Sequence, residues 1–225
     1  MIMKCLTGLV LSFLMIASSP VLAGVVMGGT RVIYPQNTRE VAFSVTNMEN
    51  STPYLIQSWV ENYDRRNKSQ PPFIVTPPLF RLDPEQTNTL RIRYTGAPLP
   101  TDRESVFWLN VKSISPKPKD GNNELQINIK SKFKIFFRPT GLGNGAETAW
   151  KKLTVSRTGS GVTINNPTPW YVSFHSLKVA GKSIPEPGMI GPGERRELPG
   201  PATGNVTWTA INDFGGITPS FSQHY

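Results

Sequence analysis

Apolar and polar side chains alternate along most of the chain, and turn-forming residues end each alternating segment. Val41, Phe43 and Val45, for example, are separated by Ala42 and Ser44. A period of two places one set of side chains on each face of a β-strand, and short strands punctuated by turns are typical of β-sandwiches and barrels. The segments with this pattern are 40–46, 54–60, 90–94, 105–114, 125–138, 153–157, 161–165, 170–179, 194–198 and 206–212.

Proline and glycine exclude a helical fold and divide the chain. The 225 residues include 21 Pro and 19 Gly, which leave few uninterrupted windows for a helix. A helical bundle or coiled coil is therefore excluded. The run Pro139–Gly145 is rich in Gly and carries no charge, so we predict a linker there. The linker separates two β domains, residues 24–142 and 146–225, each of the size of a small sandwich.

Residues 1–23 have the features of a secretory signal peptide. Lys4 gives a positive start, Leu6 to Ile16 is apolar, and Val21 to Ala23 offers small side chains at a cleavage position. The apolar run is shorter than the ~20 residues that a transmembrane helix needs, and we predict no integral membrane segment. The only cysteine, Cys5, would leave with the signal, so the exported protein must be stable through its core rather than through disulfides.

The polar residues argue against catalysis and against metals. The formal net charge of +9 favours acidic partners, but nucleic acid is not expected among them after export. The chain has two histidines, His175 and His224, and no Cys-x-x-Cys or His-Glu-x-x-His motif. Asp102 and Glu104 flank Arg103, which favours salt bridges over a paired-carboxylate catalytic site. We predict no enzymatic activity, no metal and no cofactor.

The longest strand pattern, Leu125 to Arg138, has two interpretations. One face of this strand begins with Leu125, Ile127 and Ile129, while the other face is polar and rich in lysine. The strand is either half-buried with a solvated lysine face, or it extends beyond its own core and presents those three side chains to a partner. An exposed apolar strand without a partner is an aggregation hazard, so the second interpretation requires that a partner binds this strand.

Seven short motifs occur in order along the chain: Thr30 to Tyr34, Pro53 to Val60, Thr76 to Pro84, Asp102 to Trp108, Lys132 to Pro139, Asn166 to Tyr171 and Ile211 to Gly216. Each motif is weak alone. Taken in this order, they resemble the periplasmic pilus assembly chaperones of the chaperone–usher pathway, the PapD-like family. The resemblance covers essentially the whole chain after residue 23.

The resemblance implies a fold and a set of functional residues. Two immunoglobulin-like domains would form an L, and the strand Leu125 to Arg138 would complete the unfinished sandwich of a pilus subunit, with Leu125, Ile127 and Ile129 as donor side chains. Two cations of the family's cleft, which anchor the subunit's C-terminal carboxylate, correspond to Arg31 and Lys134. A structural salt bridge between the domains corresponds to Glu104, Arg138 and Asp213.

The function implied is that of a periplasmic chaperone. Such a protein binds, folds and caps pilus (fimbrial) subunits by donor-strand complementation and delivers them to the outer-membrane usher. The stretch from Ser113 to Glu124 resembles the short form of the family's F1–G1 loop, the loop before the donor strand. The sequence leaves open whether the free protein hides its donor strand by self-association.

Two other classes of binding protein remain open from the residues alone. A secreted carbohydrate-binding or adhesin sandwich would use exposed aromatic side chains such as Trp59, Trp108 or Trp170. A protein that binds polyanions would use the lysines near the long strand, and these are Lys117, Lys119, Lys130, Lys132 and Lys134.

Overall fold

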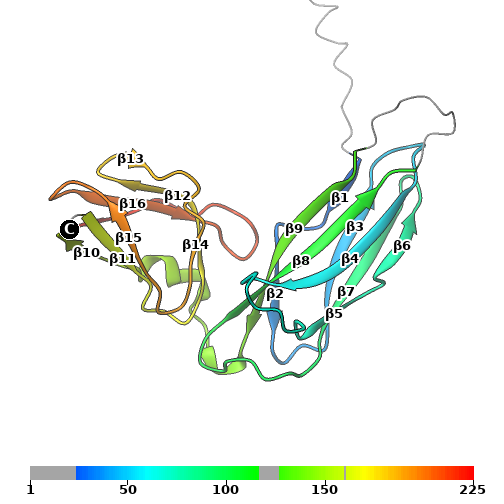
Figure 1. Cartoon of the computed structure of the whole chain (residues 1–225), viewed down its shortest axis with the longest axis horizontal. Helices are drawn as coiled ribbons and strands as arrows, with labels where there is room; N and C mark the ends of the chain where they lie inside the picture. The colour runs from blue at the N-terminus through cyan, green and yellow to red at the C-terminus, as the bar shows by residue number, and fades with distance from the viewer. Residues whose placement is uncertain (1–23, 117–126, 160) are drawn as a thin grey trace, which may run out of the picture.

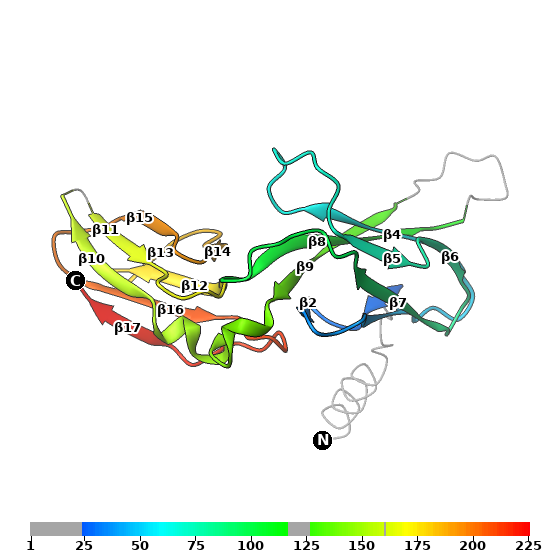
Figure 2. The same cartoon turned by 90° about the horizontal axis from the view of Figure 1, so that it is seen from below.

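The computed structural model describes residues 24–116, 127–159 and 161–225, and these ranges are almost entirely β-structure. The expected signal peptide (1–23), the donor residue Leu125 and most of the loop before the long strand lie outside the described residues. Two sandwiches meet at an angle and are joined by one connecting segment (Figures 1 and 2). The prediction of an all-β fold with two sandwiches is confirmed.

The first sandwich packs two sheets face to face. One sheet has the order β1-β3-β7-β5 and the other β2-β9-β8-β4-β6. The side chains between the sheets form a single core that includes Leu90, Leu109 and Ile135, all fully buried. The strands are β1 (Val25–Met27), β2 (Arg31–Pro35), β3 (Val41–Asn47), β4 (Tyr54–Asn62), β5 (Phe73–Thr76), β6 (Leu79–Leu82), β7 (Thr87–Tyr94), β8 (Ser105–Ile114) and β9 (Ile129–Arg138).

The second sandwich has its own core. Its sheets have the orders β10-β11-β15 and β13-β12-β16-β17, and β14 pairs with β12. Trp208 is fully buried in this core, and its indole Nε1 donates to the carbonyl of Trp150 at 2.9 Å. The strands are β10 (Thr154–Thr158), β11 (Gly161–Asn165), β12 (Val172–Val179), β13 (Lys182–Ser183), β14 (Met189–Ile190), β15 (Arg195–Pro199), β16 (Asn205–Ala210) and β17 (Phe221–His224).

A small apolar cluster joins the two sandwiches. Val106 and Phe136 of the first sandwich pack with Met189 of the second, and Ile33 and Tyr171 lie against them. The backbone contributes as well, because the amide of Glu104 donates to the carbonyl of Pro169 at 2.9 Å. Both the apolar cluster and this hydrogen bond hold the sandwiches in one relative orientation.

The expected linker and strands β12 and β9 are among the segments that differ from the sequence-based expectation. The expected linker contains the 3₁₀ turn η2 (Thr140–Leu142) and leads into a second one, η3 (Ala146–Lys151), which is held by burial of Trp150 and by its Nε1 bond to the Glu147 carbonyl. Strand β12 begins at Val172 rather than at 170, because the side chain of Asn166 bonds to Thr168 and Trp170 and keeps them out of the sheet.

Strand β9 is also shorter than predicted. Among the described residues it begins at Ile129, and Ile127 precedes it outside any strand. The reason lies in the partner strand: β8 ends at Ile114, and its last pair in the ladder joins Ser113 to Ile129. No helix in the described ranges is long and apolar enough to cross a membrane.

Candidate functional site

One edge of β9 is open over half of its length. On one side β9 pairs with β8 from Ile129 to Phe137. On the other side it pairs in parallel with β2, and only from Lys134 to Arg138. Within the described part of the chain, residues 129–133 therefore have no strand on that side, and their outward N–H and C=O groups are free to pair with another polypeptide.

The apolar side chains at the start of this open edge lie in solvent. Ile127 is 67% exposed and Ile129 is 62% exposed, whereas Phe133, closer to the middle of the strand, packs on the domain core beside Phe43. The first part of the segment thus extends beyond the sandwich that the rest of β9 helps to build. Of the two interpretations of this strand, the geometry supports the one in which it presents side chains beyond its own core.

Two cations mark the end of the open edge. Arg31 is the first residue of β2, and its register partner on β9 is Lys134. Register partners on adjacent strands project to the same face, so both side chains lie on one side of the sheet at the point where β2 begins. Within the described residues, neither side chain forms an ion pair with a carboxylate, whereas Lys130, Lys132 and Arg138 do.

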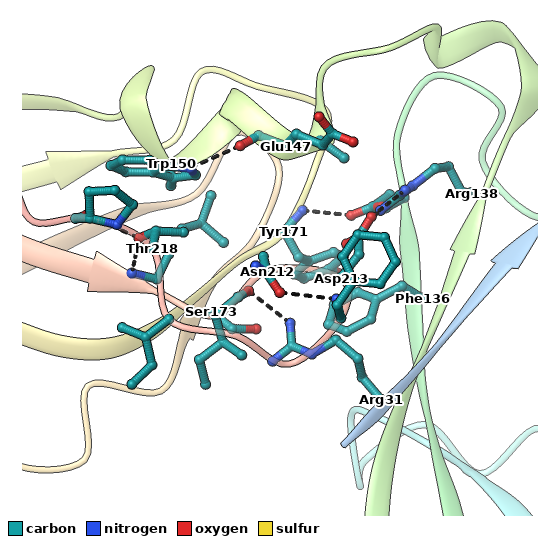
Figure 3. Close-up of a pocket in the computed structure, with 18 residues that line it drawn as sticks. Arg31, Phe136, Arg138, Glu147, Trp150, Tyr171, Ser173, Asn212, Asp213 and Thr218 are labelled. Carbon is teal, nitrogen blue, oxygen red and sulfur yellow. Dashed lines mark hydrogen bonds and ion pairs between the residues drawn. The ribbon is translucent and has the colours of Figure 1, made fainter. Parts of the chain in front are cut away.

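Arg31 is half-buried between the sandwiches. Its Nη1 donates to the carbonyl of Ile211 at 3.1 Å, and its guanidinium lies 5.6 Å from the centroid of the Phe136 ring (Figure 3). Its Nε is buried and has no hydrogen-bond partner among the described residues. Burial lowers the pKa of Arg31, and the nearby carboxylates of Asp213 and Glu104 oppose that shift. A bound anion would supply the missing partner.

Lys134 completes the cationic pair. Burial lowers the pKa of its ammonium group, and the neighbouring positive charge of Arg31 lowers it further. Its Nζ lies 5.8 Å from the centroid of a Trp108 ring. Two like charges side by side at a partly buried place are unfavourable without an anion, and a carboxylate that contacts both would relieve this repulsion.

A network of ion pairs crosses the junction of the two sandwiches. Arg138, at the end of β9, donates from Nε to Glu104 Oε1 at 2.8 Å and from Nη1 to Asp213 Oδ2 at 2.8 Å (Figure 3). Glu104 is buried, and its other oxygen accepts the backbone N–H of Tyr171 at 2.8 Å. Burial raises the pKa of Glu104, although Arg138 opposes the shift. The structure thus brings Glu104, Arg138 and Asp213 together.

Two lysines on the polar face of β9 share one neighbouring carboxylate. Lys130 and Lys132 both pair with Glu61, and they lie over the rings of Trp59 and Trp108 at 4.7 and 4.9 Å. The pKa of Glu61 is lowered to about 2. The hydrogen bond from the Trp59 indole N–H has the largest effect, and Lys132 and Lys130 lower the pKa further. This arrangement lowers the positive charge that Lys130 and Lys132 offer to a polyanion, whereas Lys117 and Lys119 lie outside the described residues.

The third tryptophan of the carbohydrate-binding alternative, Trp170, is buried in the second core. It therefore offers no exposed aromatic surface to a sugar. The exposed ion pair between Arg103 and Asp102 agrees with the salt-bridge interpretation of that segment.

Comparison with known proteins identifies the family. Residues 24–143 match the N-terminal domain of the pili and flagellar-assembly chaperone PapD, and residues 148–222 match the C-terminal domain of the pili assembly chaperone PapD. The chain therefore belongs to the chaperone–usher pilus assembly chaperones, as the ordered motifs predicted.

Among individual relatives, the chaperone protein FocC of Escherichia coli is 43% identical over 202 residues, which are 87% of this chain and 88% of FocC. The E. coli chaperone DraB has a similar structure, with a TM-score of 0.77, 38% identity, and coverage of 89% of this chain and 95% of DraB. The SafB chaperone of Salmonella enterica, in its complex with the SafA pilin, gives a TM-score of 0.80 at 36% identity, over 92% of this chain and 98% of that one.

The structure also contains functional candidates that the sequence patterns did not reveal. Phe214 and Ile217 belong to the loop that carries Asp213, and both are exposed beside the cleft that Arg31 lines. The sequence predicted the segment Ile211 to Gly216 only as a motif of the family, and within it only Asp213 had a predicted role. An aromatic residue between Asp and Gly in a turn, where a side chain rarely finds a core, is the signal that could have identified it.

Proposed function

We propose that this chain is a periplasmic chaperone that captures pilus subunits on the open edge of β9, caps them and delivers them to an outer-membrane usher. In this proposal the N-terminal domain, residues 24–142, carries the open edge and the two cations, and the C-terminal domain, residues 146–225, supplies Asp213 to the junction. The observation that carries the proposal is that the open edge ends where Arg31 and Lys134 stand.

The polarity of the guest strand follows from this arrangement. A strand that pairs with residues 129–133 lies in line with β2 and must end where β2 begins. If the guest strand runs parallel to β9, its C-terminal carboxylate meets Arg31 and Lys134. If it runs antiparallel, its end nearest the cations cannot be a carboxylate, and an N-terminal ammonium there would be repelled. The cations therefore select a parallel guest strand with a free C-terminus.

The apolar donor side chains contribute affinity, and the two cations contribute both affinity and register. Burial of Ile127 and Ile129 in a subunit groove stabilises the complex by roughly 1.5–3 kcal/mol each, before the costs of ordering are subtracted. Leu125, which lies outside the described residues, stays a predicted third donor. Each charge-assisted bond to the carboxylate adds about 1.5–3 kcal/mol and fixes where the guest ends. The fixed end sets the register, because a slip by one residue would turn the guest's apolar side chains to the wrong face.

The proposed work needs no catalysis. No covalent bond is made or broken when a strand is lent to a subunit, and release at the usher requires only that another strand replaces β9. Association with the usher and a periplasmic location are part of the proposal, and both rest on membership of the family.

Co-purification tests the anchor. A pilus subunit is expressed in the periplasm with the chaperone or with Arg31→Ala or Lys134→Ala, and the amount of subunit that co-purifies is measured. We expect each substitution to abolish capture while the thermal unfolding temperature stays close to that of the parent protein. Lys182→Ala, an exposed lysine on the second sandwich, is the matched control and should retain capture. Undiminished capture by both anchor variants would contradict the assignment.

A further inference from the structure

The loop between β16 and β17 presents apolar side chains to solvent. Phe214 is 93% exposed and Ile217 is 58% exposed. The loop projects from the second sandwich toward the first (Figure 1). Together with Arg31 and Phe136 of the first sandwich, both side chains line one pocket at the junction. We call residues 211–218 the cleft hairpin.

The cleft hairpin is held rigidly by its own hydrogen bonds. The side-chain oxygen of Asn212 accepts from the backbone N–H groups of Phe214 and Gly216 at 3.0 and 2.8 Å, and the backbone N–H of Asn212 donates to the Gly216 carbonyl at 2.9 Å. A β-bridge joins Ile211 to Ile217. The exposed ring of Phe214 therefore stands on a fixed backbone.

The first sandwich fixes the position of the cleft hairpin. Arg31 bonds to the Ile211 carbonyl, and Arg138 pairs with Asp213. Gly215 adopts a φ of +85°, and a Cβ there would stand 2.5 Å from the hydroxyl of Thr30, so the hairpin and the start of β2 are in close contact. The apolar tip is thus fixed relative to the two cations that end the open edge.

An exposed aromatic side chain on a fixed backbone is well suited to binding a partner, because little backbone freedom is lost when it becomes covered. Its surroundings indicate the chemistry of that partner. Arg31 has an unpartnered buried Nε, and Ser173 has a buried hydroxyl without a hydrogen-bond partner in the described residues. Both line the same pocket as the apolar rim of Phe136, Phe214 and Ile217. The combination fits a polypeptide end that carries a carboxylate and an apolar side chain.

We propose that Phe214 and Ile217 form a second binding surface, on which the cleft hairpin packs against an apolar side chain within the last two residues of the captured subunit. This inference rests on the proposed function, since it assumes that the subunit's carboxylate sits at Arg31 and Lys134. Successive side chains of a strand point to opposite faces, so one of the last two residues faces the cleft. The second domain thereby favours subunits that have a large apolar residue at one of their last two positions.

Synthetic peptides test the proposal on the whole protein. Two peptides of about ten residues with alternating Val and Thr, the length of a strand, differ only in ending with Phe-Phe or Ser-Ser, and both have a free carboxylate. Binding is measured by fluorescence anisotropy. We expect the parent protein to bind the Phe-Phe peptide about tenfold more tightly, and we expect Phe214→Ala to remove most of that preference. Ile217→Ser should reduce it in part.

The controls separate this proposal from the anchor. Ile74→Ser changes an apolar side chain of similar exposure (46%) on β5, in the other sheet of the first sandwich, and should keep the preference. Amidation of the Phe-Phe peptide should weaken binding by the same factor in the parent and in Phe214→Ala. An unchanged Phe-Phe preference in Phe214→Ala would overturn the proposal, even where amidation still weakens binding and so supports the anchor.

The remaining outcomes are equally decisive. If amidation has no effect on the parent protein, the carboxylate anchor of the proposed function is wrong, while the comparison of Phe-Phe with Ser-Ser still judges the cleft hairpin. If Phe214→Ala instead converts a dimer to a monomer in gel filtration and leaves the peptide preference intact, the cleft hairpin serves self-association and the proposal is overturned. Failure of the parent protein to bind any of the peptides would contradict both proposals.

Discussion

Replacement of Glu104 by Gln would disturb the junction between the sandwiches at one buried point. The carboxylate of Glu104 accepts from Arg138 Nε and from the backbone N–H of Tyr171, each at 2.8 Å. A protonated Glu side chain can still accept at both of its oxygens, whereas a Gln side chain has one acceptor oxygen, so its NH₂ must face one of these two donors. A buried donor left without a partner costs about 1–3 kcal/mol, and we expect Glu104→Gln to destabilise the protein by roughly 2 kcal/mol at low pH.

The pH dependence of that cost has a definite sign. Burial raises the pKa of Glu104 above the ordinary value of 4.5, so the folded state holds this proton more tightly than the unfolded state does. The stability that the parent protein derives from Glu104 is then fully present below pH 4.5 and falls as the pH rises through the folded-state pKa. The Gln variant has no such group. The difference in stability between the two proteins should therefore be largest near pH 4 and should shrink toward neutrality.

Urea unfolding followed by tryptophan fluorescence between about pH 4 and 7 measures this difference. Glu197→Gln, which changes an exposed carboxylate on β15, is the matched control and should behave like the parent protein at every pH. A cost of Glu104→Gln that grows with pH would refute the reasoning, because it would mean that Arg138 lowers the pKa of Glu104 by more than burial raises it.

Two further predictions concern the strand that we propose to be lent. Ile129→Ser should weaken capture of a co-expressed pilus subunit without lowering the thermal unfolding temperature, since Ile129 is mostly exposed in the free protein; a large drop in that temperature would instead place Ile129 in the chaperone's own core. Glu61 has a pKa lowered to about 2 by Trp59 and the two lysines, so its stabilising effect is present above pH 4.5 and is lost as the pH falls toward 2. Glu61→Gln should flatten the pH dependence of unfolding in that acidic range, and a variant with the unaltered acid transition would contradict this assignment.

Much of the strand content could be predicted from alternation alone. The segments 105–114 and 161–165 coincide with β8 and β11, because each strand is bounded by turn residues and has a partner along its whole length. Strands β5 and β6 were missed since each has only four residues and prolines adjoin them. The start of β9 could not be found from its own residues, because it depends on where β8 ends.

The candidate site could be predicted only through the resemblance. Arg31 and Lys134 are about a hundred residues apart in sequence, and nothing local to either indicates that β2 and β9 pair in parallel. The contact of Arg138 with Asp213 likewise depends on how the two sandwiches meet. The exposure of Phe214 is a property of the turn around it, where Asn212 holds the backbone and leaves the ring in solvent, and no hydrophobic pattern announces it.

A crystal structure of the chaperone in complex with a pilus subunit tests the central claim most directly. We expect one subunit strand to be hydrogen-bonded along residues 129–133 of β9, parallel to it, and to end with its carboxylate in contact with Arg31 and Lys134. A complex in which that edge of β9 remains unpaired, or in which the guest strand runs antiparallel to β9, would contradict the claim.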